Sequence, residues 1–315
     1  MKILSVSQNK GGTGKTSTSR LIAEYASLHR VRTLLLDLDP QCSLSQRYLR
    51  MQRDATAADG ILPPVHPEFD PNSPEDAGWD GISSTANIFT NPERLYSYVT
   101  SHPFLEIIPG KGDELRRVER VQEEDVAEKI HERMRTFLRG PEIAEAFDLV
   151  VLDTSPDKGP LTTSALRAAT HVIIPTVPEP QGIEGLQGML MLFRQENRNR
   201  EDDDLLKLVG ILPNRVRSNV SLHEGLLMQL REDIALRDSV LTNQLGQRTA
   251  FSEMDHESNF DRSIFHLPKS DVARKEAEAV CAEIAERMGL QLGERITDRS
   301  LANEAERNSS AEEAA

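Results

Sequence analysis

The sequence is poor in cysteine, in aromatic side chains and in positive charge. Its two cysteines, Cys42 and Cys281, lie far apart without the spacing of metal ligands, which argues against a disulfide framework or a zinc site. Aromatic residues make up 4% of the chain, too few for a surface on which nucleic-acid bases stack. The net charge of −14 repels nucleic acid overall, so any DNA binding needs a local basic patch.

Long apolar runs are also absent. No stretch is long enough to span a bilayer, and Met1-Lys2 leads into a strand-like run rather than a secretory leader. With the scarcity of cysteine, this predicts a cytoplasmic protein without a membrane partner. The 315 residues are ample for one large α/β domain, which we expect over residues 1–290, followed by an acidic, flexible tail over 291–315.

The hydrophobic pattern alternates between short apolar runs and helical periodicity, which predicts a mostly parallel sheet with helices on both faces. The predicted strands are Ile3–Val6, Thr33–Leu36, Leu105–Ile108, Leu149–Leu152, Val172–Pro175 and Leu208–Leu212. The predicted helices include Lys15–Ser27, Ser43–Arg50, Gly182–Asn197, Leu222–Ala235 and Asp271–Met288.

Two segments do not fit this minimal core. Residues from about 53 to 92 are rich in proline and predict a long surface insertion, ordered around Trp79. The insertion either contributes to a binding site for a partner or is a plain insertion without a binding role, and the second interpretation is favoured. Glu114 to Arg139 is dense in charges of both signs, which predicts a solvated helix.

The most informative feature is the glycine-rich run from Lys10 to Ser17, which reads Lys-Gly-Gly-Thr-Gly-Lys-Thr-Ser between a predicted strand and a predicted helix. Glycines in such a turn let backbone N–H groups approach a phosphate, and the helix start adds partial positive charge. Lys15 neutralises phosphate charge and the hydroxyl of Thr16 suits Mg²⁺. The residues expected to bind nucleotide here are Lys10, Gly11, Gly12, Thr13, Gly14, Lys15, Thr16 and Ser17.

This run departs from the usual phosphate-binding pattern at its start. Asn9 stands where that pattern has glycine, and a second lysine, Lys10, precedes the glycine pair. Because Lys15 already serves the phosphates of its own chain, Lys10 is expected to serve the nucleotide of a facing subunit. The alternative is a solvated loop lysine.

The run resembles the deviant Walker A motif of the ParA/MinD ATPases, with Lys10 at the position of their signature lysine. Three further segments are similar to ParA switch and strand motifs; they are Asp37-Leu38-Asp39-Pro40-Gln41, Leu149 to Pro156 and Ile173 to Glu179. The resemblance implies a P-loop NTPase fold, with ATP and Mg²⁺ as cofactors. It also implies slow ATP hydrolysis by the protein alone.

Acidic residues follow the predicted strands at the edge where ligands bind in open α/β sheets. We expect Thr16 to ligate Mg²⁺ directly, and Asp37 and Asp153 to hold it through water. Family resemblance implies that Asp39 matters for hydrolysis, with Lys10 and Lys15 supplying charge. The alternative for Asp37 and Asp39 is a role in a turn or a helix cap.

The base pocket is predicted after the strand that ends near Leu212. Asn214 is placed to bond the edge of adenine and Arg215 to stack on its face, as in related ATPases. The alternative is an ordinary Pro-Asn turn.

ParA resemblance further implies an ATP-bound homodimer that holds nonspecific DNA, associates with the nucleoid, and is released when a ParB-like partner stimulates hydrolysis. Nonspecific DNA binding needs Lys and Arg along the phosphates. The candidates are Arg217, Arg248, Lys269, Arg274 and Lys275, together with Arg215 and Arg262. Taken singly, each is more simply a solvated surface charge.

The second function class is a MinD-like ATPase that positions itself on a membrane or positions a protein cargo. That group ends in a basic amphipathic helix. Arg287 to Arg295 has some amphipathic character, but the acidic residues that follow would be repelled by an anionic membrane.

Overall fold

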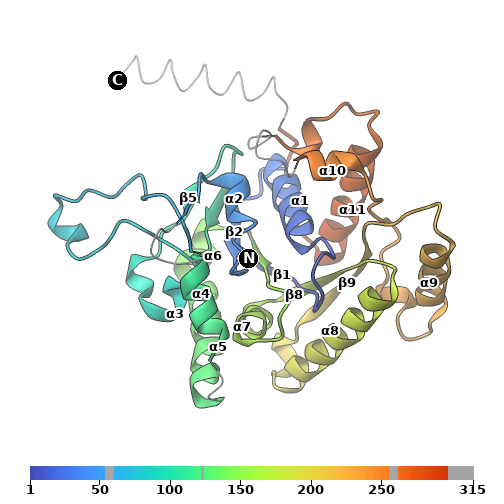
Figure 1. Ribbon diagram of the computed structural model, residues 1–315, viewed down its shortest axis with the longest axis horizontal. Helices are drawn as coiled ribbons and strands as arrows, with labels where there is room; N and C mark the ends of the chain where they lie inside the picture. The colour runs from blue at the N-terminus through green and yellow to red at the C-terminus, as the bar shows by residue number, and fades with distance from the viewer. Residues whose placement is uncertain (54–59, 122–123, 255–261, 297–315) are drawn as a thin grey trace.

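The computed structural model describes residues 1–53, 60–121, 124–254 and 262–296, and they build a seven-stranded sheet in the order β5-β6-β2-β7-β1-β8-β9 (Figure 1). The strands are β1 (Lys2–Val6), β2 (Thr33–Asp37), β5 (Tyr98–Val99), β6 (Leu105–Ile108), β7 (Leu149–Asp153), β8 (His171–Thr176) and β9 (Lys207–Pro213). All neighbours are parallel except β5, which is antiparallel to β6. The six predicted strands are confirmed within one residue at each end, and β5 was not predicted.

Helices cover both faces of this sheet, as predicted (Figure 1). The helices are α1 (Lys15–Leu28), α2 (Ser45–Tyr48), α3 (Asn87–Thr90), α4 (Gly112–Glu119), α5 (Glu124–Leu138), α6 (Pro141–Ala146), α7 (Pro160–Ala168), α8 (Pro180–Arg198), α9 (Ser221–Glu232), α10 (Thr249–Met254) and α11 (Val272–Met288). Successive strand residues point to opposite faces, so Leu4 joins a core under α1 and α11 while Ile3 joins a second core under α5, α7 and α8.

The segment from Glu114 to Arg139 corrects one prediction. It forms two helices, α4 and α5, and each buries an apolar stripe rather than standing in solvent. On α5, Ile130, Met134 and Leu138 recur every four residues, and the last two are fully buried. The dense charges occupy the other faces of the two helices, which hid this stripe in the overall composition.

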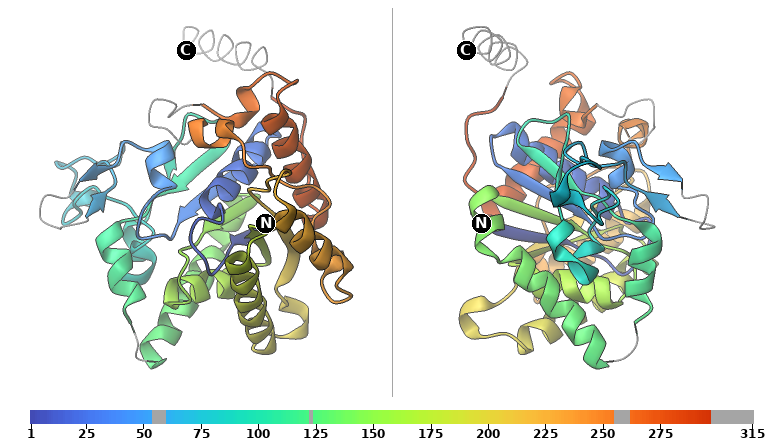
Figure 2. Two further views of the ribbon diagram at one scale, coloured as in Figure 1. Left: turned by 45° about the vertical axis from the view of Figure 1, so that its right-hand side comes forward. Right: turned by 90° about the vertical axis from the view of Figure 1, so that its left-hand side faces the viewer.

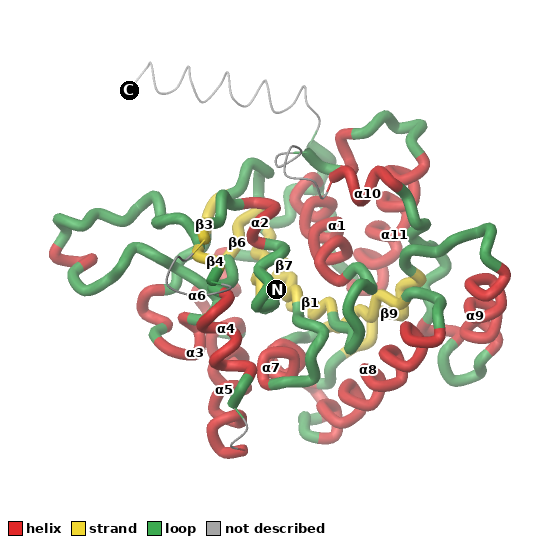
Figure 3. The backbone as a smooth tube through the Cα atoms, viewed as in Figure 1, coloured by secondary structure: helices red, strands yellow, loops and turns green. Residues whose placement is uncertain are grey.

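The proline-rich insertion projects from the body as an arm that is mostly loop (Figures 1 and 3). It begins at a short ladder of β3 (Gln52–Arg53) and β4 (Ile61–Leu62). Trp79 organises it, with ring centroids 5.3 Å from Phe69 and 5.0 Å from Tyr96, which confirms order around this tryptophan. Its last part is not a surface loop, because Thr85 is buried and its hydroxyl donates to the carbonyl of Asp37 at 2.7 Å.

The C-terminal boundary also differs from the prediction. α11 ends at Gly289 in the left-handed region, and residues 290–296 then run back along the end of α1 without forming a helix (Figure 2). The amide of Ile296 donates to the carbonyl of Leu28 at 2.7 Å, and its side chain is 4% exposed. The folded body therefore continues to Ile296 rather than to residue 290, and the rest of the predicted tail lies outside the described residues.

Candidate nucleotide site

The loops that follow β1, β2, β7, β8 and β9 converge at one edge of the sheet, with β1 near the centre. Ligands of open parallel sheets bind beyond the carboxyl ends of the strands. The local sequence explains the geometry, because each apolar run gives way to a polar residue at this edge: Ser7, Asp37, Asp153, Thr176 and Asn214. The predicted nucleotide residues are brought together at this edge.

Two of the three glycines in the glycine-rich loop have a left-handed backbone. Gly12 and Gly14 have φ values of 73° and 83°, and Gly14 caps α1. The ammonium of Lys15 donates to the carbonyl of Lys10 at 3.1 Å, which folds the loop around it. Burial lowers the pKa of Lys15, whereas the charges of Asp153 and Asp39 raise it. A cation that is this poorly hydrated interacts strongly with an incoming anion.

Asp153 ends β7 and is fully buried beside Asp37, its partner in the β2–β7 register. One carboxylate oxygen accepts from the hydroxyl of Ser19 at 3.0 Å, and the other, Oδ2, is buried without a partner among the described residues. Burial, followed by the nearby charge of Asp37, raises the pKa of Asp153 to about 8, although the hydroxyls of Thr16 and Ser19 oppose this.

An orphan carboxylate oxygen close to Thr16 fits a hard cation that is also bound to phosphate. Within the ranges that the structure describes, no cluster of three or more His, Cys, Asp or Glu side chains forms a metal site made by protein alone. The donor set therefore suits Mg²⁺ that arrives with a nucleotide rather than a resident ion.

Asp37 differs from Asp153 because both of its oxygens are engaged. Oδ2 accepts from the amide and hydroxyl of Ser45 at 2.8 and 2.6 Å, and Oδ1 accepts from the amide of Asp39 at 3.1 Å. The alternative role in a turn and helix cap is thus present in the structure. A role of Asp37 in holding a metal through water stays a prediction.

Asp39 lies on the loop after β2. Its Oδ1 accepts from the amide of Gln41 at 2.9 Å, which leaves the other oxygen to accept from a water. Burial raises the pKa of Asp39, while the charge of Lys15 lowers it. Asp39 is therefore close enough to Lys15 for their charges to interact.

The Lys10 side chain contacts its own chain in this structure. Its ammonium lies 3.2 Å from Oε2 of Glu184 on α8, and the two side chains are 38% and 71% exposed. The predicted role of Lys10 toward a facing subunit is therefore neither performed nor blocked in the single chain.

Asn214 and Arg215 brace the phosphate loop from the end of β9. The amide of Asn214 donates to the carbonyl of Thr13 at 2.8 Å, and Arg215 Nη1 donates to the carbonyl of Gly12 at 2.7 Å. A side chain at Gly14 would collide with the Asn214 amide, only 2.3 Å from the place of its Cβ. Holding the loop is thus the role these two residues have here, and contact with a base stays a prediction.

A hollow of about 160 Å³ opens beside these residues. Gln247 and Phe251 line it from the start of α10, together with Ser17 and Leu21 of α1. Neither Gln247 nor Phe251 was assigned to this site from the sequence. The nearby Gln-Arg-Thr-Ala-Phe-Ser-Glu segment was the available signal, but its distance from the glycine-rich loop in the sequence concealed the contact.

Two of the basic residues predicted for DNA have side-chain partners in the chain. The guanidinium of Arg217 donates to Gln247, and Arg248 is paired with Glu276 at 2.6 Å. Lys269 and Lys275 are exposed on the loop before α11 and on its first turn. These four residues remain candidates.

The prediction that Arg274 contacts DNA needs correction. Arg274 is 9% exposed, donates to the carbonyl of Leu267 at 2.5 Å and pairs with Glu278 at 2.9 Å. Asp271 caps α11 and directs this first turn toward the body, so the guanidinium of Arg274 is turned away from solvent. Arg274 is removed from the set of DNA candidates.

Glu119 caps the start of α7, a structural role that was not predicted from the sequence. It closes α4, and its Oε2 accepts from the amide of Leu161 at 3.2 Å in the first turn of α7, just after the β7 loop. Gly159 makes room for it, since a Cβ there would lie 2.0 Å from Oε1 of Glu119. A charge within a densely charged segment carries no local signal for such a distant cap.

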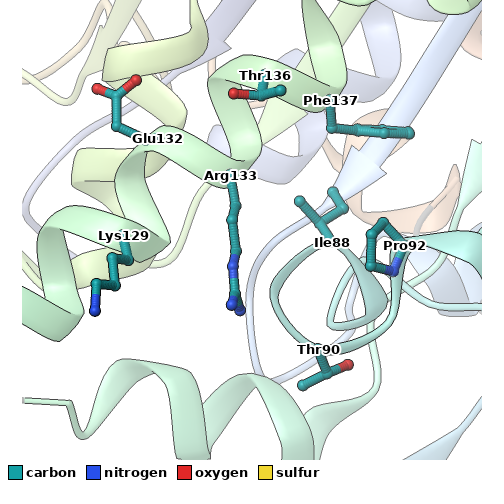
Figure 4. Close-up of a pocket in the computed structure, with 8 residues that line it drawn as sticks. All are labelled: Ile88, Thr90, Pro92, Lys129, Glu132, Arg133, Thr136 and Phe137. Carbon is teal, nitrogen blue, oxygen red and sulfur yellow. The ribbon is translucent and has the colours of Figure 1, made fainter.

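A larger hollow, of about 540 Å³, lies between α5 and the region of α3, away from the glycine-rich loop (Figure 4). Two of its three charged lining residues have partners in the chain, since Arg133 donates to the carbonyl of Phe89 and Glu132 pairs with Arg167 at 3.0 Å. Ile88, Pro92 and Phe137 give it an apolar wall. Size alone does not make this the nucleotide site, because the convergent polar groups are at the loop.

Comparison with known proteins agrees with this geometry. The profile of the AAA domain family matches residues 1–205. A ParA family protein of Chlamydia muridarum is 32% identical over 255 residues, covering 76% of this chain and 88% of the relative. The chromosome-partitioning ATPase Soj of Thermus thermophilus is 25% identical over 289 residues, covering 90% and 96%.

Solved structures give the same fold. The ATP complex of a McdA variant from Cyanothece has a TM-score of 0.68 at 16% identity, covering 94% of this chain and 99% of that one. In the described part of the chain, none of the helices combines the length and apolarity that a bilayer crossing requires. The glycine-rich loop, the carboxylates at the strand ends and these similarities together identify the chain as a member of the ParA family of partition ATPases.

Proposed function

We propose that this protein is an ATP-hydrolysing dimeric switch that partitions DNA, holding nonspecific DNA as the ATP-bound dimer. Hydrolysis is slow in the protein alone and is stimulated by a ParB-like partner, which releases the DNA. The observation that carries the ATPase part is the buried, unpartnered oxygen of Asp153 beside Lys15 at a glycine-rich helix start. The DNA part rests on family membership and on the exposed basic residues.

In this proposal each residue has one task. Thr16, Asp37 and Asp153 hold Mg²⁺, which when bound screens the phosphate charge. Lys15 neutralises phosphate charge in its own chain, and Lys10 does so in the facing chain. Asp39 orients the attacking water, using the oxygen that does not accept from Gln41. Asn214 and Arg215 brace the loop and frame the base.

A nucleotide-binding experiment tests the ATPase part. We expect Lys15→Ala to lose binding of a fluorescent ATP analogue, because no other buried cation faces the loop among the described residues. Asp39→Ala should bind ATP but lose hydrolysis. Lys207→Ala, an exposed lysine at the opposite edge of the sheet, is the matched control and should behave as wild type. Normal ATP turnover by Lys15→Ala contradicts the proposal.

A DNA-retention experiment tests the second part. We expect wild type to bind random-sequence duplex only with ATP, and Asp39→Ala to stay bound. Removing one side chain that binds a phosphate, as in Arg248→Ala or Lys275→Ala, should lower the slope of log affinity against log salt by about 1. Binding that is independent of ATP or unchanged at high salt contradicts the DNA part and leaves the ATPase part standing.

The MinD-like alternative gains no support from the described C-terminal residues. The predicted amphipathic segment is divided between the end of α11 and an extended run docked on α1, and Arg295 is paired with Glu278 at 2.8 Å. Sedimentation with anionic vesicles and ATP separates the two classes.

A further inference from the structure

Helix α8 passes closely beneath the start of the phosphate loop. Gly185 and Gly188 lie three residues apart on α8 and make this approach possible. A Cβ on Gly185 would lie 2.7 Å from Cγ of Lys10, and one on Gly188 would lie 3.0 Å from the amide nitrogen of the Asn9 side chain. The aliphatic part of Lys10 therefore lies directly against the α8 backbone.

The charged end of Lys10 also has a partner on this helix. Glu184 directly precedes Gly185, and its Oε2 lies 3.2 Å from the Lys10 ammonium. Packing of its methylene groups against the α8 backbone and the ion pair with Glu184 together hold the Lys10 side chain on this helix. The Lys10 side chain is thus bound along its length to its own chain, although it begins in the loop that receives phosphate.

We propose that α8 is a docking site for Lys10 in the nucleotide-free single chain, and that Glu184 competes with the facing subunit's nucleotide for this lysine. The inference rests on the proposed role of Lys10 toward the facing subunit. In this proposal the ammonium leaves Glu184, which lies 3.2 Å away in the single chain, when it reaches a phosphate of the facing chain. Dimer formation must therefore release two such pairs, and Glu184 sets how readily the ATP-bound protein dimerises.

The solvent exposure of the Lys10–Glu184 ion pair sets the expected effect of removing it on dimer formation. A solvent-exposed ion pair is weak, so removing it should ease release of each lysine by about threefold. Because a symmetric dimer releases two lysines, the dimer dissociation constant should fall about tenfold. The difference should shrink with added salt, since screening weakens the pair in wild type.

The test is analytical ultracentrifugation with saturating ATP and Mg²⁺ and without DNA, in the hydrolysis-deficient Asp39→Ala background. Glu184→Gln should dimerise at about tenfold lower protein concentration at low salt, and at nearly the wild-type concentration at high salt. Glu184→Lys should dimerise at least as readily as Glu184→Gln. Glu142→Gln, which removes an exposed glutamate on α6, is the matched control and should change nothing.

Lys10→Ala separates failure of this inference from failure of the proposed function. If Lys10→Ala dimerises with ATP as wild type does, the facing-subunit role fails and the docking proposal fails with it. If Lys10→Ala does not dimerise and Glu184→Gln dimerises as wild type or less readily, the competition by Glu184 is disproved while the proposed function stands. Unchanged binding of ATP to the Glu184→Gln monomer shows that the loop itself is intact.

Discussion

Two buried carboxylates on neighbouring elements have opposite environments. Glu24, in α1, is 1% exposed and is surrounded by donors: Arg20 at 2.6 Å, Tyr48 at 3.1 Å and the hydroxyl of Ser263. Asp153, at the end of β7, is equally buried but leaves one oxygen without a partner in the described residues.

The pKa directions follow from this difference. Burial alone raises the pKa of Glu24, but the charges of Arg20 and His102 and the Ser263 hydroxyl outweigh it and hold this pKa below its usual value. Burial and the charge of Asp37 raise the pKa of Asp153. A buried carboxylate with all its donors supplied by the chain stabilises the fold, whereas one that lacks a donor is kept for a ligand.

The largest expected effect is on the satisfied carboxylate. Glu24→Ala removes the buried carboxylate that accepts from the guanidinium of Arg20, which is itself 6% exposed. We expect the free energy of unfolding to fall by about 3–5 kcal/mol in urea denaturation followed by circular dichroism. Glu142→Ala on the surface should change this free energy little. A decrease in Glu24→Ala as small as that of this control would show that Glu24 does not stabilise the fold.

The next effect concerns the unsatisfied carboxylate. Asp153→Asn should reduce Mg²⁺-dependent ATP hydrolysis by about 100-fold, because it weakens the site for the metal. The free energy of unfolding should stay the same or rise, since a neutral amide replaces a carboxyl whose charged form is disfavoured by burial and by Asp37. Steady-state turnover and urea denaturation of the same preparation measure both, with Asp203→Asn as control. Strong destabilisation by Asp153→Asn would show that this carboxylate is structural.

The pH dependence of thermal stability tests the role assigned to Glu24. The pKa of Glu24 is lower in the folded chain than its ordinary value of 4.5, so the unfolded chain takes up a proton first as pH falls. Its contribution to stability is complete above pH 4.5 and is lost as pH drops through the folded pKa. The melting temperature of wild type should therefore fall more steeply below pH 4.5 than that of Glu24→Gln, which starts lower. Parallel curves would contradict this.

The smallest effect isolates one donor. Tyr48→Phe removes the hydroxyl that donates to Glu24 at 3.1 Å, while Arg20 still donates to the same oxygen. We expect the free energy of unfolding to decrease by about 1 kcal/mol. Tyr96→Phe, in the exposed arm, is the matched control and should be less destabilised. Equal decreases in the two variants would mean that the network around Glu24 does not depend on its individual donors.

Much of the fold was predictable because its signals are local. The apolar runs of β1 and β7 end at loop-forming residues, and the loop from Lys10 to Ser17 carries its own phosphate chemistry. The inward turn of Arg274 and the docking of Ile296 on α1 were not predictable. Both depend on partners that lie far away in the sequence, and composition favoured the opposite result in each case.

The sequence by itself determined where strands begin and end, and which loop has the pattern of a phosphate-binding turn, because glycine, lysine and β-branched residues act within a few positions of themselves. Only the tertiary structure decided which buried carboxylate is satisfied. Ser263 reaches Glu24 across 239 residues, and Ser19 reaches only one oxygen of Asp153 across 134. Partnering over such separations is set by packing of the sheet and helices, and no local pattern records it.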